Sequence, residues 1–236
     1  MIRDVATELR SIAESADDAA GYFPALYSQV TSQIARSIEQ SAFADGDRMN
    51  VFATEFASRY IGAFRREITR PRCWQATWDV AGDRLLIVQH LLLGINAHVN
   101  YDLPQSVAAV ARESHDLEGA RADFDAVNDV LSATSVDVLR RLDRVSRWTS
   151  NVAALGGGRM FNFSLRAARA QAWSAAERLY ALDEQQRRTY VAELDRLVAV
   201  LAYMITRPSF PATLFVAAAR HLEERDPRKV TAVLLE

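Results

Sequence analysis

Cysteine, lysine and histidine are scarce in this chain of 236 residues, and so are glycine and proline. Its one cysteine, Cys73, cannot form a disulfide within the chain, so a reducing cytoplasm is the expected location. Nine glycines and six prolines are too few for a collagen-like or low-complexity protein. No apolar run reaches the roughly 18–20 residues that a membrane span needs. The first residues are too polar for a signal peptide. We therefore expect a globular protein without a membrane span.

Positive charge comes almost entirely from arginine, since Lys229 is the one lysine among 28 basic residues. The formal net charge is −2, which gives no electrostatic reason to expect nucleic-acid binding. The arginine excess reflects either a GC-rich coding sequence or buried cations, because Arg keeps its charge where Lys would lose a proton. With 50% hydrophobic and 25% charged residues, the chain is expected to form one helical domain over residues 1–236.

Apolar residues recur at spacings of three and four almost throughout the chain, which predicts an all-α protein. We expect a single compact bundle of about eight to ten helices around a buried central helix, Arg84–Tyr101, whose apolar residues lie nearly all round it. The triple glycine 156–158 predicts a loop within this bundle. The expected helices cover Arg3–Ala16, Pro24–Gln40, Met49–Thr69, Trp74–Trp78, Arg84–Tyr101, Pro104–Ser114, Leu117–Ser132, Val136–Leu155, Asn162 or Ser164 to Leu182, Glu184–Thr206 and Ala212–Arg225.

Polar residues interrupt the most apolar of these helices in a regular pattern. His90 and His98 are eight residues apart, which places them about 80° apart around a helix and about 12 Å apart along it. Gly94 lies midway on that face, and Asp102 follows His98 by about one turn. Glycine inside a helix and unpaired buried polar groups both cost stability. The pattern therefore predicts an internal polar pocket beside this helix.

Imidazole and carboxylate groups one helical turn apart are suited to two kinds of chemistry. They can hold a divalent ion such as zinc, iron or manganese. Without a metal, the carboxylate can orient the imidazole for acid–base catalysis. We expect one divalent ion at most. The candidate metal ligands are His90, His98, Asp102 and Asp125, and the candidate catalytic residues are His98, Asp102, Asn100 and Arg169.

Each of these residues also has a purely structural interpretation. His98 can be an ordinary core histidine, and Asp102 can cap the helix that contains Pro104. Asp123, Asp125 and Asp129 can form a solvated helix face, and Arg169 can stack on Trp173. The sequence leaves these alternatives open.

The segment from His90 to Pro104 resembles the signature of an uncharacterised all-helical family, a domain of unknown function. Its pattern is His-x7-His-x-Asn-x-Asp-Leu-Pro. The stretch Asp123-Phe124-Asp125-Ala126-Val127-Asn128 and the set Arg166, Arg169 and Trp173 are similar to further family motifs. The resemblance implies no reaction. The His-x-x-x-Asp pair is also faintly similar to helical zinc-dependent phospholipase C and nuclease proteins, which carry several more histidines than this chain.

Two functional hypotheses follow from these patterns. The first is an enzyme with a buried His/Asp pocket that performs metal-assisted hydrolysis or acid–base chemistry on a small, partly apolar substrate. Asp123 and Asn128 would also line that pocket, and Arg169 would neutralise an anionic group of the substrate. The second is a non-catalytic helical module that binds an apolar small molecule or a partner protein. In that case the aromatic stripe from Phe52 to Phe64, with Trp74 and Trp78, would line the site.

Overall fold

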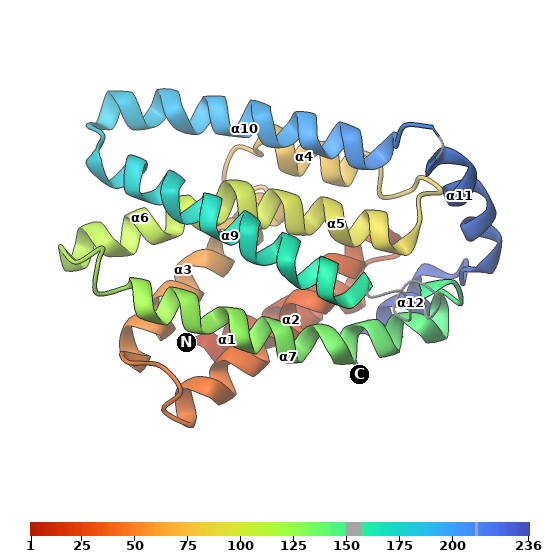
Figure 1. The fold of residues 1–236 in the computed structure, drawn as a ribbon, viewed down its shortest axis with the longest axis horizontal. Helices are drawn as coiled ribbons and strands as arrows, with labels where there is room; N and C mark the ends of the chain where they lie inside the picture. Colours follow the sequence, from red (N-terminus) through yellow and green to blue (C-terminus); the bar gives the residue numbers. More distant parts are fainter. Residues whose placement is uncertain (150–156, 211) are drawn as a thin grey trace.

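Helices make up the regular structure of the chain in a computed structural model that describes residues 1–149, 157–210 and 212–236 (Figure 1). No β-strand occurs in these ranges, where an isolated antiparallel bridge pairs Ser146 with Glu223. The all-α prediction is confirmed. The helices are α1 (Ile2–Ser15), α2 (Tyr22–Glu39), α3 (Gly46–Arg65), α4 (Arg72–Asp79), α5 (Ile87–Ala97), α6 (Leu103–Ser114), α7 (Arg121–Val145), α9 (Gly157–Ala181), α10 (Glu184–Thr206), α11 (Ala212–Ala219) and α12 (Pro227–Leu234), with 3-10 turns at Ala19–Gly21 and Arg220–Leu222.

The most apolar helix, α5, lies inside the bundle as its composition predicts. It packs against α2 on one side and against α10 and α4 on the other (Figure 1). Leu91, Leu93 and Ala97 are buried. A helix surrounded by other helices has no polar face to present to water, which explains why its apolar residues are not confined to one stripe.

The chain does not break between α5 and α6, contrary to the expected boundary after Tyr101. Instead, the residues from His98 to Asp102 form one turn of π-helix, in which the Leu103 N–H donates to the His98 carbonyl five residues earlier. Pro104 has no N–H to donate, and its ring crowds the carbonyl four residues before it, so a widened turn ahead of it relieves both problems. Asp102 has helical backbone angles and its side chain makes no capping hydrogen bond, so the capping interpretation is wrong.

Gly94 serves close packing between α5 and α2. A Cβ atom at position 94 would overlap the ring of Phe23, which packs directly on the glycine backbone. The same ring contacts the His98 imidazole with 5.4 Å between ring centroids. The sequence pattern assigned the space above Gly94 to a ligand, whereas the structure fills it with an aromatic side chain.

Other helix bounds also differ from the expected ones. Helix α5 begins at Ile87 rather than at Arg84, α3 covers Gly46–Arg65 rather than Met49–Thr69, and the largest differences concern α7 and α9. A single helix, α7, replaces the pair Leu117–Ser132 and Val136–Leu155. The hydroxyls of Thr134 and Ser135 donate to the backbone carbonyls of Val130 and Ser132, so these residues stay in the helix. Helix α7 ends at Val145, before the expected end at Leu155, which itself lies outside the described residues. Helix α9 begins at Gly157, several residues before the expected start, and Gly156 is likewise outside the described ranges.

Candidate functional site

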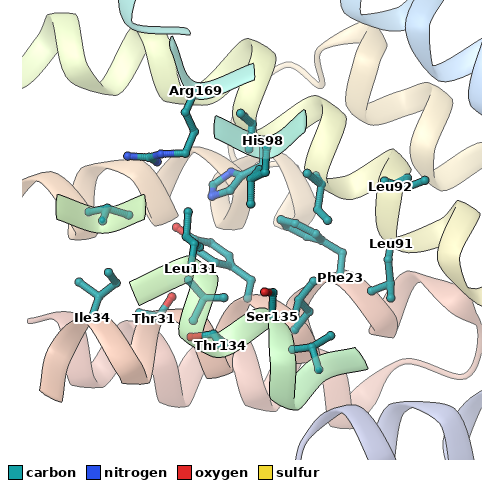
Figure 2. Close-up of a pocket in the computed structure, with 18 of the residues that line it drawn as sticks. Phe23, Thr31, Ile34, Leu91, Leu92, His98, Leu131, Thr134, Ser135 and Arg169 are labelled. Atoms are coloured by element: carbon teal, nitrogen blue, oxygen red, sulfur yellow. The ribbon is translucent and has the colours of Figure 1, made fainter. Parts of the chain in front are cut away.

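A pocket of about 330 Å³ lies between α2, α3, α5 and α7, with α9 at one side (Figure 2). Its walls are mostly aliphatic and aromatic side chains, and no Asp or Glu lines it. We call it the central pocket. The polar and charged side chains in its lining, apart from the tyrosine and tryptophan rings, are Thr31, His98, Thr134, Ser135, Thr149 and Arg169.

The size of the central pocket is unusual for a protein interior that serves only folding. Protein cores are close-packed, with few voids larger than a water molecule. This pocket is far larger than such voids, and it is partly open rather than sealed. The volume also falls in the range of small-molecule sites, roughly 300–1,000 Å³.

The π-helical turn brings His98 and Asp102 together as the sequence pattern suggested. The His98 Nδ1 atom lies 3.1 Å from the Asp102 Oδ2 atom. The same oxygen accepts a hydrogen bond of 3.0 Å from the indole nitrogen of Trp74 on α4. All three side chains are buried. The imidazole is therefore fixed at one nitrogen by a carboxylate that is itself held in place.

Aromatic rings surround the imidazole on several sides. The Phe56 ring of α3 stacks on it, with ring centroids 3.6 Å apart and planes 9° apart. The Tyr27 ring of α2 meets it edge-on at 4.3 Å. The other nitrogen, Nε2, is buried and makes no hydrogen bond to any described residue. Figure 2 shows the His98 ring among the side chains around the central pocket, while its Nε2 atom itself is covered by neighbouring atoms.

Burial decides the protonation of this pair. Desolvation lowers the pKa of His98 and raises the pKa of Asp102, in each case because burial disfavours the charged form. When both groups are uncharged, the carboxyl proton is donated to Nδ1 and the imidazole carries its own hydrogen on Nε2. In this form Nε2 is a hydrogen-bond donor. With Asp102 ionised and His98 neutral, Nε2 becomes an acceptor instead.

Arg169 contributes a buried cation to the same pocket. Its side chain is only 4% exposed. Its Nε atom donates to Asn128 at 2.8 Å and its Nη2 atom to the Phe124 carbonyl at 2.6 Å, while the guanidinium lies 4.2 Å from the Phe124 ring centroid. It forms no ion pair with any carboxylate in the described ranges. Burial lowers the pKa of Arg169 to about 10, so it remains protonated at neutral pH.

The other expected metal ligands do not lie beside His98 and Asp102. His90 turns toward Tyr22 and the Asp83 carbonyl, and Asp125 is half-exposed in an ion pair with Arg121. Neither lines the central pocket. Among the described residues, no three His, Cys, Asp or Glu side chains are grouped as a metal site would require. The expected set therefore does not fit one shared ion.

Two further residues expected in the pocket hold the structure together elsewhere. Asn100 donates to Asn96, which in turn donates to the Val198 carbonyl of α10. Asp123 is buried and accepts hydrogen bonds from the backbone nitrogens of Ala44 and Asp45. Neither Asn100 nor Asp123 lines the central pocket.

The sequence pattern missed the residues that complete the site from other helices. Tyr27 and Thr31 lie one turn apart on α2, and both line the central pocket. Their place there depends on how α2 packs against the other helices. Part of the aromatic stripe does line the pocket, namely Phe52 and Phe56. Trp74 belongs to the adjacent core and binds Asp102. The aromatic stripe in the sequence therefore indicated part of the pocket wall. Nothing in the sequence indicated the hydrogen bond between Trp74 and Asp102.

Similarity to known proteins identifies the family of the chain. In the described ranges, no helix is both long and apolar enough to cross a bilayer. No curated protein and no solved structure matches the chain, and the faint similarity to phospholipase C and nuclease proteins stays unconfirmed. Residues 2–208 match a family described as "Family of unknown function (DUF5995)". Since the match covers nearly the whole chain, the protein belongs to this uncharacterised all-helical family.

Proposed function

We propose that this protein binds a small, largely apolar molecule in the central pocket. The observation that carries the proposal is the pocket itself: about 330 Å³, walled mainly by apolar side chains, with His98, whose buried Nε2 is unpaired, among its lining residues. Small-molecule sites are mostly apolar, with a few placed polar groups that fix orientation. An unpaired buried polar atom costs about 1–3 kcal/mol, which a ligand could recover by hydrogen bonding to it.

A neutral apolar fluorophore, N-phenyl-naphthylamine, tests the proposal directly. We expect saturable binding of one molecule per chain. Ala53→Phe should weaken it by about tenfold or more, because a phenyl ring on the pocket wall overpacks the site at a typical cost of 1–3 kcal/mol. Fluorescence titration measures both affinities.

The matched control is Val51→Phe, which adds the same ring to an exposed position two residues away on α3. It should bind the fluorophore as the parent protein does. Circular dichroism and urea unfolding check that both variants fold. Absence of saturable binding to the parent protein, or equal affinities for the two variants, would contradict the proposal.

The His98–Asp102 pair favours a second candidate function, acid–base chemistry on the bound molecule. A carboxylate that orients an imidazole beside a pocket is the arrangement that general bases use. The Nε2 atom would take or give the proton, and Asp102 would hold the ring in position. Chemistry through a metal is not part of this proposal, because the expected ligands lie apart.

The chromogenic ester p-nitrophenyl decanoate tests this second function. Hydrolysis by the parent protein should fall by about 10²–10⁴-fold in His98→Gln, the typical contribution of a general base. His90→Gln is the matched control, since His90 lies outside the pocket and should not affect the rate. Equal rates in the two variants would leave ligand binding as the function.

A further inference from the structure

The charge balance of the central pocket identifies the class of its ligand. Arg169 is buried, protonated at neutral pH and free of any ion pair with a described carboxylate, and no acidic side chain lines the pocket. A buried charge without a partner is costly, and it is normally paired or neutralised. Asp125, which raises the pKa of Arg169, is half-exposed and already pairs with Arg121, so the positive charge in the pocket lining is only partly compensated.

The hydrogen-bond donors at this end of the pocket are also incompletely used. A guanidinium has five N–H groups, and the structure assigns two of those of Arg169, to Asn128 and to the Phe124 carbonyl. His98 offers a further donor at Nε2 when the His98–Asp102 pair is uncharged. Figure 2 shows Arg169 and His98 on the same side of the pocket, across from Thr31, Thr134 and Ser135.

Resting on the proposed binding function, we propose that the ligand is an apolar monocarboxylate. Its carboxylate lies at the Arg169–His98 side, and its hydrocarbon body lies against the apolar walls formed by α2, α5 and α7. The guanidinium supplies the opposite charge and the N–H donors that carboxylates prefer. The single negative charge of a carboxylate balances the single positive charge of the guanidinium. A phosphate monoester carries nearly two negative charges, which exceeds that balance.

The alternative is that Arg169 only ties α9 to α7 through its contacts with Asn128 and Phe124. Both explanations require a buried arginine, but only the proposal requires preference for an anionic head group. A series of ligands with one hydrocarbon chain and different head groups separates the two explanations without any substitution in the protein.

The experiment is calorimetric titration of the full chain with decanoate, decanol and decyl phosphate at neutral pH. Decanoate should bind at least about tenfold more tightly than decanol, the usual contribution of a charge-assisted hydrogen bond. Decyl phosphate should bind more weakly than decanoate. Tighter binding of decyl phosphate, or equal binding of decanoate and decanol, would overturn the monocarboxylate assignment while leaving the binding function intact. Absence of binding by all three would instead refute the binding function.

Two variants locate the head group. Arg169→Met removes the charge and keeps a long side chain, so the preference for decanoate over decanol should disappear. Arg166→Met is the matched control, since Arg166 lies three residues earlier on α9, is exposed and pairs with Asp129. A preference for decanoate that survives in folded Arg169→Met protein would show that Arg169 is structural. If Arg169→Met does not fold, Arg169→Lys is used instead, because it keeps the charge. It should fold and retain a reduced preference for decanoate over decanol. No such preference in Arg169→Lys would overturn the placement of the carboxylate beside Arg169.

Discussion

Asp102→Ala is expected to lower the free energy of unfolding by about 2–5 kcal/mol, because it leaves two buried polar groups without their partner at about 1–3 kcal/mol each. The substitution leaves the indole nitrogen of Trp74 and Nδ1 of His98 without their shared acceptor in a buried environment. Asp102→Asn keeps an acceptor oxygen for these groups, so it should cost no more than about 1–2 kcal/mol. Urea unfolding followed by circular dichroism measures all three proteins.

Asp129→Ala is the control for this prediction. The Asp129 side chain is 85% exposed and pairs with an exposed arginine, so its removal should change stability by no more than about 0.5 kcal/mol. If Asp102 served only as a helix cap, Asp102→Ala would cost about 1 kcal/mol. A loss that small would contradict the arrangement of His98, Asp102 and Trp74 described above.

Asp123→Ala should be comparably destabilising, by about 3–5 kcal/mol, although Asp123 is outside the central pocket. Its carboxylate accepts the backbone N–H of Ala44 at 2.6 Å, the N–H of Asp45 at 3.1 Å and an N–H of Arg48 at 2.8 Å. These contacts fasten the segment before α3 to the first turn of α7. Removing this buried carboxylate takes the acceptor from three N–H groups at once.

Asp125→Ala is the natural comparison, because Asp125 lies two residues further along the same helix. Its side chain is 51% exposed and pairs with Arg121, so the expected change is within about 0.5 kcal/mol. Thermal or urea unfolding of the two variants measures the difference. Similar stabilities for both would show that Asp123 is not the anchor of this segment.

The helical architecture could be predicted from the sequence because it depends on local spacing. The bounds Glu184–Thr206 agree with α10, since Asp183 caps the helix by accepting from the Gln186 N–H. The helix boundaries that were predicted wrongly also have physical causes. Thr134 and Ser135 resemble a helix boundary in sequence but bond back to the helix backbone. A π-helical turn leaves no mark in a pattern judged at 3.6 residues per turn.

The candidate site could be predicted only where its residues share a helix. His98 and Asp102 are four residues apart, so their contact follows from helix geometry. The Trp74 hydrogen bond, the Phe56 stacking and the unpaired state of Arg169 depend on how α3, α4 and α9 pack around that helix. Helix spacing holds no information about those contacts. For the same reason Asp123 and Asp125 on α7 were expected in the central pocket, and neither lines it.

The most direct test of the central claim is a crystal structure of the protein grown with decanoate. The account predicts electron density for one molecule in the central pocket, with its carboxylate within hydrogen-bond distance of Arg169 or of Nε2 of His98, and with its chain against α2 and α7. An ordered but empty pocket at a decanoate concentration that saturates the protein, or decanoate bound only at the surface, would contradict it.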